Sequence, residues 1–429
     1  MHKINRRAAL ALGSGVLLSA EAGAQTSPPA TQSDLQQRLV ERVLQNVHPI
    51  AVTAGRFSGP GWDLLMGEAR GSEFVMLGEE HGLAETPILA RELFLALHPS
   101  GFDTLAIEIS RPIAEDLEEA ARDGLEGITA FARKYPPGPA FYFWKPEAEL
   151  IAAVRTAIPA KHAVLWGLDY EMACDRRLIE RLQAKVPGSA KAALDTLDRV
   201  SETARETWRA TRNPGALFTF SGDPELVRAV RRAWPSADAD ASRILDTLEE
   251  TLEINRLFGS GKGWESNERR ARFNRANLVA LLDAASIEGR RPKVLFKMGE
   301  SHMMRGVNWT GNFDVGSLVP EIAAMRGGKT FSFLVGGGRN SHHGVLNPTD
   351  MSVVDKPADM FEQLGLLFLA NAASQPGPVL IDLRPLRALV SSTRAQLALN
   401  NPEAVRNIHA FDAMIVWNGS TATRMLVAR

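Results

Sequence analysis

The sequence predicts an α/β fold with three layers, in which a mainly parallel central sheet has helices on both faces and carries a helical insertion. Seven short runs of apolar or β-branched residues alternate with segments of helical periodicity, the pattern of strand–helix–strand units. Each run ends at Gly, Asp, Ser or Asn, as buried strands do. The chain has 429 residues, of which 45% are hydrophobic and 23% charged. That composition is enough for one large core or for two to three smaller ones.

The first residues are predicted to be an export signal. Arg6 and Arg7 belong to a short basic start, residues 8–20 are mostly apolar, and residues 22–24 (Ala-Gly-Ala) have the spacing of a signal-peptidase site. The apolar run is too short to cross a bilayer, which takes roughly 20 residues. The paired arginines resemble a twin-arginine signal, and an ordinary secretory signal is the alternative. We therefore expect residues 1–24 to direct export to the periplasm or the medium, with no membrane segment after signal removal.

The rest of the chain is expected to form one domain. Residues 25–45 are expected to form a linker and an N-terminal helix, and residues 46–429 to form the α/β domain. Residues 86–97 have an apolar helical face, so the first two strands and this helix predict a right-handed crossover in a parallel sheet. The strands are expected at residues 73–77, 104–109, 163–168, 293–298, 330–335, 378–383 and 413–417.

A long segment without strands separates the third and fourth strands. Residues 172–290 are rich in Arg, Glu and Ala and have helical periodicity, clearest at 239–257 and 264–285. We expect a helical insertion packed over one side of the sheet. On its last helix the leucines form the apolar face, and three arginines are expected to face solvent: Arg269, Arg270 and Arg272.

Charge and cysteine content exclude several classes of protein. Lys and Arg number 49 and Asp and Glu 50, a formal net charge of −1, so nucleic acid is not an expected partner. The single cysteine, Cys174, excludes an internal disulfide and a cysteine-cluster metal site. It is expected to be a small core residue. The near-zero net charge fits a small-molecule substrate as the expected partner.

Ionisable residues concentrate where four predicted strands end. Ligands of open parallel sheets bind at the carboxyl ends of the strands, because the loops there converge. Gly-x-x-His follows a buried strand twice, at residues 78–81 and 299–302, and glycine there permits a sharp turn and a close approach. The candidate site residues near these ends are Glu79, Glu80, His81, Glu108, Asp169, Glu171, Glu300 and His302.

Several of these residues have a structural alternative. Glu108 lies inside an apolar strand, where an unpaired carboxylate is costly. Either it pairs with Arg or His for structural reasons, or its pKa is tuned for chemistry. Asp169 is either part of the site or the N-cap of the next helix. His81 alone could be a structural histidine, and the repeated motif favours the site.

These motifs resemble the superfamily that unites erythromycin-esterase-like proteins, haem-uptake ChaN-like proteins and the Tiki/TraB group, with the best fit to the first branch. The resemblance covers about residues 73–305. It implies that Arg91 and Arg270 are active-site arginines. The esterases usually place their first glutamate three residues before the histidine, whereas Glu79 is two before His81, which leaves the roles of Glu79 and Glu80 open. The matching segments are 77–82, 105–108, 167–169, 270–277 and 298–302.

The resemblance implies hydrolysis of an ester or amide in a small molecule, and the residue types suffice for it. A histidine polarised by a carboxylate can take a proton from water. Glu108 would orient or strengthen that histidine, and Arg91 or Arg270 would stabilise an oxyanion. Asp169, Glu171 and Glu300 are expected to bind substrate or support these groups. Ser301 lacks the Gly-x-Ser-x-Gly context of a nucleophile.

Other functions remain open from the sequence. His81, Glu108 and His302 could hold a divalent metal with a bound water, as in a Tiki/TraB-like metallopeptidase, although no HExxH motif exists. A cofactor is thus either absent or a divalent metal. A haem-binding periplasmic protein, with Tyr135 or Tyr142 near the haem, and an inactive scaffold are further alternatives.

Two more segments could face the site. Residues 336–344 contain glycines and two adjacent histidines, and read as a flexible substrate-facing loop or a hairpin. Residues 135–144 combine prolines with an aromatic cluster, which either walls a pocket or packs onto the core.

Overall fold

The structure is a computed structural model that describes residues 31–138, 141–158, 162–347, 349–350 and 352–427. The expected export signal and the linker up to residue 30 lie outside the described residues. The expected N-terminal helix is present as α1 (Gln32–Leu44), which begins in a capping box at Thr31. None of the helices in the described part is long and apolar enough to cross a membrane.

The central sheet has eight strands and is mainly parallel, as predicted. Six neighbouring strands run parallel, whereas β11 runs antiparallel to its neighbours β12 and β1. All seven expected strands are present; β1, a three-residue edge strand, was missed. In spatial order the strands are β1 (Val47–Pro49), β11 (Gly377–Asp382), β12 (Ala413–Asn418), β8 (Thr330–Gly337), β4 (Phe74–Glu79), β7 (Lys293–Gly299), β5 (Phe102–Ser110) and β6 (Leu165–Asp169).

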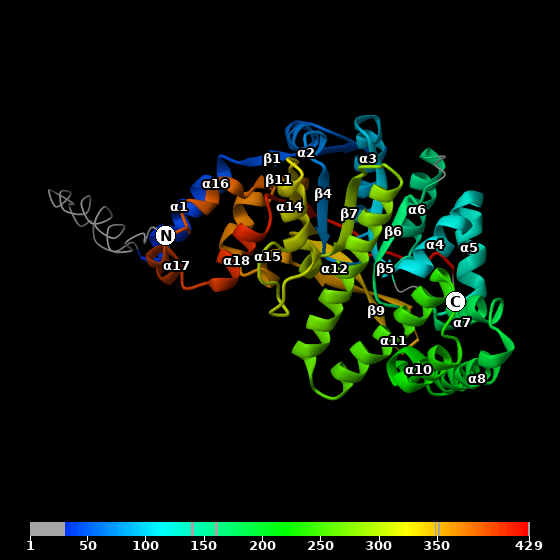
Figure 1. The fold of residues 1–429 in the computed structure, drawn as a ribbon. Coiled ribbons are helices and arrows are strands. Elements are labelled where there is room, and N and C mark those ends of the chain that lie inside the picture. Colours follow the sequence, from blue (N-terminus) through cyan, green and yellow to red (C-terminus); the bar gives the residue numbers. More distant parts are fainter. Residues whose placement is uncertain (1–30, 139–140, 159–161, 348, 351, 428–429) are drawn as a thin grey trace, which may run out of the picture.

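Two apolar cores lie on opposite faces of this sheet. Side chains alternate along β4, so that Val75 and Leu77 join one core and Phe74 and Met76 the other. The first core is covered by α2 (Pro60–Arg70), α3 (Glu85–Leu97), α4 (Arg111–Ala120), α5 (Gly124–Lys134) and α6 (Lys145–Ala157). The second is covered by α1, α12 (Gly263–Ile287), α13 (Glu300–Met303), α14 (Val315–Met325), α15 (Met360–Gln363), α16 (Arg384–Arg387), α17 (Thr393–Leu399) and α18 (Pro402–Ala410). Figure 1 looks onto the face that α12 and α14 cover.

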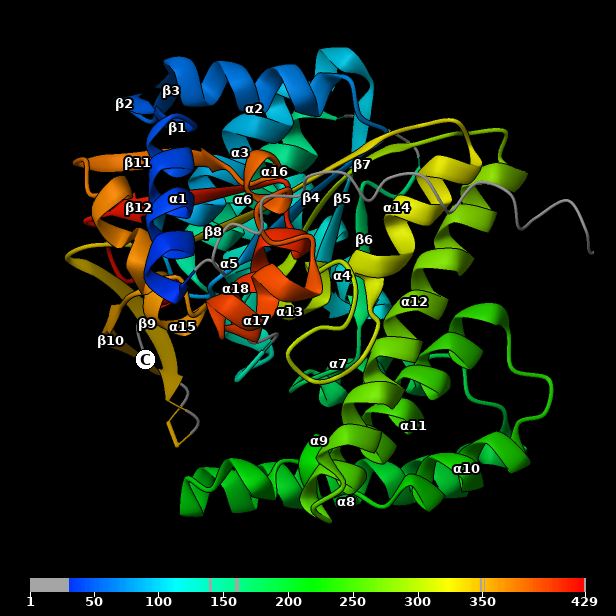
Figure 2. The same ribbon diagram turned by 90° about the vertical axis from the view of Figure 1, so that its left-hand side faces the viewer.

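The segment between β6 and β7 forms helices and contains no strand among its described residues, as expected. It forms α7 (Asp175–Gln183), α8 (Gly188–Thr211), α9 (Phe218–Ser221), α10 (Pro224–Ala233), α11 (Ala239–Gly259) and α12. The expectation that it packs over one side of the sheet is wrong. Helices α7, α8, α10 and α11 join the first core, whereas α12 joins the second. Figure 2 shows α8 and α10 at the bottom of the molecule, beyond the sheet.

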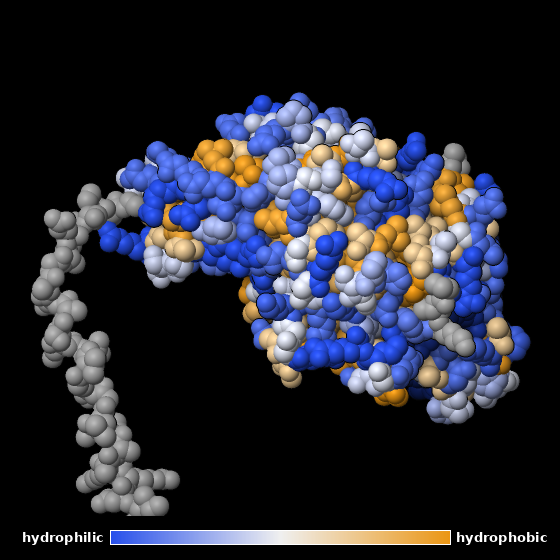
Figure 3. Space-filling view, turned by 90° about the horizontal axis from the view of Figure 1, so that it is seen from above, coloured by the Kyte–Doolittle hydropathy of each residue, from blue (hydrophilic) through white to orange (hydrophobic). Residues whose placement is uncertain are grey.

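Two hairpins lie outside the central sheet. β9 (Ser341–Asn347) pairs with β10 (Ser352–Ala358), and β2 (Ala51–Thr53) with β3 (Arg56–Ser58). Residues 336–344 are therefore the end of β8, a turn at Asn340 with φ 56°, and the start of a hairpin. The face seen from above is mainly hydrophilic with small, separate hydrophobic patches (Figure 3).

Candidate active site

The carboxyl ends of β4, β7, β5 and β6 lie side by side and gather most of the expected site residues. Glu79 at the end of β4 is in register with Gly299 of β7, and Ser110 of β5 with Asp169 of β6. This edge brings together His81, Glu108 and His302, with Glu79, Asp169 and Arg270 around them.

Glu108 is the centre of the cluster. Its Oε2 accepts a hydrogen bond from the Gly299 backbone N–H at 2.6 Å and lies 3.3 Å from His81 Nε2. Its Oε1 accepts from Arg270 Nη2 at 2.9 Å and lies 3.3 Å from His302 Nε2. Only 9% of the residue is exposed. The buried carboxylate is therefore paired with two histidines and an arginine, as the cost of an unpaired charge requires.

His81 is held by a carboxylate on its other nitrogen. Its Nδ1 lies 3.1 Å from Glu79 Oε1, and the Phe141 ring stacks on the imidazole with 4.0 Å between ring centroids. A proton on Nδ1 directed at Glu79 leaves Nε2 as the basic nitrogen. The 3.3 Å from Nε2 to Glu108 is longer than an ordinary N–H···O bond. Nε2 is thus the nitrogen left to act as a base, on a side chain that stays 26% exposed.

His302 is likewise held through its Nδ1 by a carboxylate, that of Asp314, which was not predicted from the sequence. Its Nδ1 lies 2.6 Å from Asp314 Oδ2, while Asp314 Oδ1 accepts from the Val315 N–H that begins α14. An aspartate at a helix N-cap carries no functional signal in the sequence, because capping alone explains it. Two histidine–carboxylate pairs therefore face Glu108 from opposite sides.

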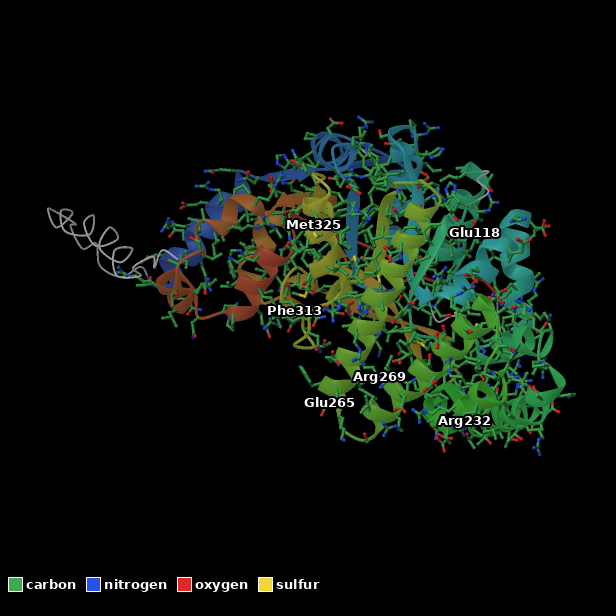
Figure 4. All side chains as sticks on the ribbon, in the orientation of Figure 1. Glu118, Arg232, Glu265, Arg269, Phe313 and Met325 are labelled. Carbon is green, nitrogen blue, oxygen red and sulfur yellow. The ribbon has the colours of Figure 1, made fainter. Side chains whose placement is uncertain are left out.

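Arg270 joins the cluster from α12, so the expectation that it faces solvent is wrong. Its guanidinium pairs with both carboxylate oxygens of Asp169 and with Glu108, and it lies over the Tyr170 ring. Arg269, labelled on the ribbon in Figure 4, instead pairs with Glu250 of α11 at 2.7 Å. Helix α12 runs between the sheet and α11, so it has polar contacts on two sides and periodicity does not distinguish them.

Asp169 does not cap the following helix. That helix, α7, begins at Asp175 with Cys174 as its N-cap, and Asp169 accepts instead from the Tyr170 N–H at 2.8 Å and from Arg270. Cys174 is buried in the first core, as expected. Asp169 therefore positions Arg270 beside Glu108.

Lys297 is a second residue that the sequence analysis missed. It lies on β7 with no exposed side-chain surface, and its Nζ donates to Glu79 Oε1 at 2.7 Å and to Glu147 Oε1 at 2.6 Å. The signal was available, because Lys297 interrupts an apolar strand just as Glu108 does. Glu147 lies on helix α6, and nothing in the sequence around it indicated a site residue.

Gly299, the glycine of the second Gly-x-x-His motif, has no room for a side chain because site residues pack directly against it. A Cβ on Gly299 would lie 2.7 Å from His81 Nε2 and 3.1 Å from Glu108 Oε2. Both are shorter than ordinary carbon contacts. The glycine therefore lets the carboxylate and the imidazole approach the backbone of β7.

Three expected site residues lie outside this cluster, and a fourth, Glu171, lines the small cavity beside Glu108. Glu80 pairs with His343 at 2.9 Å and accepts from the Gly337 N–H, so it anchors the β9 hairpin. Glu300 accepts from the indole of Trp309. Glu171 accepts from the Ser110 hydroxyl and from the N–H groups at the start of α7. The ion pair of Arg91 is with its neighbour Glu92, and among the described residues no contact joins Arg91 to Glu108 or the histidines.

The charges of the cluster shift the pKa values of both histidines in one direction. Burial alone lowers the pKa of His81, but the negative charges of Glu108 and Glu79 overcome it and raise the pKa to about 10. Burial and Arg270 lower the pKa of His302, and Glu108 and Asp314 raise it to about 10. Burial raises the pKa of Glu108, and the two charged histidines hold it well below its usual range. At neutral pH the resting site therefore holds protonated histidines around an ionised glutamate.

We predict that Glu79→Gln moves the pH profile of any hydrolysis by this site toward acid. A base must lose its proton to act, so kcat/KM should rise with pH through the raised pKa of His81, about 10. Removing the Glu79 charge removes one cause of that raised pKa, so the rise should occur at lower pH. Glu80→Gln is the matched control and should leave the profile in place. A profile that Glu79→Gln leaves unmoved, measured over pH 5 to about 11, would contradict this assignment.

The residues around Glu108 do not fit a resident divalent metal. The group whose geometry could hold a metal is Glu108, Asp169 and His302, because one ligand atom of each lies within 4.8 Å of the others. This group contains Asp169 where the sequence analysis expected His81. However, the Arg270 guanidinium pairs with both carboxylates of that group. A metal ion would share those oxygens with a fixed positive charge, and the two cations repel each other.

A small cavity lies against Glu108. It has a volume of about 20 Å³ and is lined by Glu108, Phe141, Asp169 and Arg270, among others. A space of this size holds a single water, which needs about 10–15 Å³. Polar groups on several sides supply the hydrogen bonds that such a water requires.

The aromatic segment at residues 135–144 fulfils both of its expected roles. Phe141 walls the site against His81, while Tyr142 and Trp144 are buried. The Tyr142 hydroxyl accepts from the Glu108 N–H at 3.0 Å, and the Tyr135 hydroxyl donates to Glu180 at 2.6 Å. Both tyrosine hydroxyls are thus engaged with protein groups.

Comparison with known proteins places this arrangement in a known fold. No protein-family model matches the chain, and no curated protein matches it. Several solved structures are similar, among them the following three. A Bacillus cereus protein has 15% identity and a TM-score of 0.56 and covers 91% of this chain and 99% of its own. A succinoglycan biosynthesis protein has 13% identity and a TM-score of 0.57, covering 91% and 98%. A mutant erythromycin esterase, EreC, in its open conformation has 14% identity and a TM-score of 0.52, covering 86% and 95%. These similarities confirm, for the fold, the resemblance that the motifs indicated.

Proposed function

We propose that the protein is an exported hydrolase that cleaves an ester or amide bond in a small molecule with a histidine-activated water. The observation that carries the proposal is the geometry of His81, whose Nδ1 is held by Glu79 while Nε2 faces Glu108 and the water-sized cavity lies against that carboxylate. The fold shared with an erythromycin esterase supports a hydrolase of this kind. The basic start and apolar run of residues 1–24 support export.

In the proposed reaction the fraction of His81 that has lost its Nε2 proton takes a proton from water as the water attacks the carbonyl carbon. Glu79 holds the Nδ1 proton, so the ring keeps the tautomer in which Nε2 is basic. Glu108 orients both imidazoles through its two oxygens.

Charge that develops on the carbonyl oxygen needs a positive partner. Arg270 and protonated His302 lie on the Oε1 side of Glu108 and are the cations closest to it there. We assign them to the oxyanion, in place of Arg91, because they contact the cluster. His302 can then return a proton to the leaving group, with Asp314 holding its ring.

The proposal is tested by His81→Asn in a panel of small esters and amides. We expect kcat/KM to fall by at least about a hundredfold, the usual contribution of a general base. His343→Asn is the control, since His343 pairs with Glu80 away from the cluster. Unchanged hydrolysis by folded His81→Asn protein would sink the proposal. Each assay is repeated with a chelator, and activity lost to the chelator would contradict the metal-free mechanism.

A further inference from the structure

A groove separate from the catalytic cluster lies at the end of helix α8. It has a volume of about 810 Å³ and is bounded by the last turns of α8, the loop at Pro136, strand β10 and the C-terminal segment at Met425. Small-molecule sites have volumes of about 300–1,000 Å³. Two arginines line this groove, Arg209 and Arg212, together with Trp208.

Two arginines on this side of α8 have no ion-pair partner among the described residues. Arg205 and Arg209 are four residues apart, and like charges at that spacing destabilise a helix. Among the residues that the structure describes, neither forms an ion pair, and the buried Nε of Arg205 has no hydrogen-bond partner. Asp350 is the acidic residue of the lining, so two arginines face one carboxylate and leave a formal charge of +1.

A second, independent feature is the indole of Trp208. The residue is only 4% exposed, and within the described part of the chain its Nε1 is buried without a hydrogen-bond partner. An indole N–H can only donate, and a buried donor without an acceptor is costly. The helix dipole explains cations at the end of α8. It does not explain why a buried donor on a residue that lines the groove has no acceptor.

The groove is connected to the catalytic centre by two short stretches of chain. Met425 is two residues after Thr423, whose N–H donates to the carbonyl of Gly82, the neighbour of His81. Trp208 packs against Ala173, the neighbour of Met172, which lines the cavity beside Glu108. Two residues of extended chain span about 7 Å. The lining of the groove and the catalytic cluster are therefore joined by only a few residues of chain on two sides.

We propose that this groove binds an anionic group, a carboxylate or phosphate, through Arg209, Arg212 and Trp208, and that the substrate carries such a group. The part that concerns the substrate rests on the proposed hydrolase function. Guanidinium groups match the paired oxygens of carboxylates and phosphates, and the indole N–H supplies a further donor.

The first test compares two esters that differ in charge, the 4-nitrophenyl monoester of succinate and neutral 4-nitrophenyl butyrate. In the double variant Arg209→Gln/Arg212→Gln, kcat/KM for the succinate ester should fall about tenfold, a loss typical of removed charge–charge contacts. Hydrolysis of the butyrate ester should not change. Arg199→Gln is the matched control, since it removes one positive charge from an exposed position of the same helix. Equal losses on both esters, or none, would overturn the substrate assignment.

The second test measures binding without catalysis. Succinate and inorganic phosphate are each titrated calorimetrically into wild-type protein, the double variant and Trp208→Phe. Binding to wild type that the double variant loses and Trp208→Phe weakens supports the groove, and the ligand that binds tells carboxylate from phosphate. Equal heats from wild type and double variant, or no binding, overturn it. If an anion binds but no ester is cleaved, the hydrolase proposal fails and the groove stands.

Discussion

Glu108→Gln is expected to lower kcat/KM by at least about a thousandfold and to destabilise the fold by about 3–5 kcal/mol, the usual cost of breaking a buried ion pair. The neutral amide leaves the positive charges of His81, His302 and Arg270 close together without the negative charge that now compensates them. The pKa of both histidines should fall from about 10, since the Glu108 charge is a cause of each raised value. Ester hydrolysis, urea unfolding and imidazole titration by NMR measure the three effects.

A matched control separates this effect from a general loss of negative charge. Glu119→Gln removes a carboxylate that is 67% exposed and, within the described part of the chain, pairs only with Arg122. It should change neither activity nor stability measurably, because exposed ion pairs contribute little. A Glu108→Gln protein with wild-type activity, or with histidines whose titration has not moved, would show that Glu108 does not organise the site.

Lys297→Met is expected to destabilise the protein by about 3–5 kcal/mol, because it leaves two carboxylates buried without their cation. Glu79 and Glu147 are both almost fully buried, and Lys297 Nζ bonds to both. Burial and the charge of Glu79 raise the pKa of Glu147 to about 7 even though Lys297 lowers it, so its ionised form depends on this partner. Equilibrium unfolding in urea measures the loss.

Lys293→Met is the control, because Lys293 stands at the start of the same strand with part of its surface exposed. It should cost well under 1 kcal/mol, the range of surface changes, roughly ±0.5 kcal/mol. A double-mutant cycle with Glu147→Gln should show that the second change costs less once Lys297 is gone. Additive losses would mean that the two side chains do not act as a pair.

The sheet could be predicted because buried strands and amphipathic helices have local signals. Each of the seven predicted strands has an apolar run that a parallel sheet buries on both faces. Strand β1 was missed because three residues that include His48 and Pro49 do not form such a run. The direction of β11 was not predicted, because an apolar run does not record which way it pairs.

The candidate site could be predicted in part for a related reason. Strand ends of a parallel sheet meet at one edge, so the residues that follow four strands had to come together there. His81, Glu108 and His302 were found in this way, and the structure places them in one cluster. Asp314 could not be found, because its contact with His302 depends on where α14 lies relative to β7.

The sequence by itself determined the layers of this protein and the edge at which its polar residues gather, since hydrophobic periodicity and strand termini are properties of neighbours along the chain. Only the tertiary structure decided which of two adjacent glutamates faces His81. Glu79 meets His81 and Lys297, while Glu80 turns to the β9 hairpin. It also placed Arg270 beside Glu108 across 162 residues. Such pairings arise from the burial of charges contributed by distant segments, and each segment's own sequence is compatible with more than one partner.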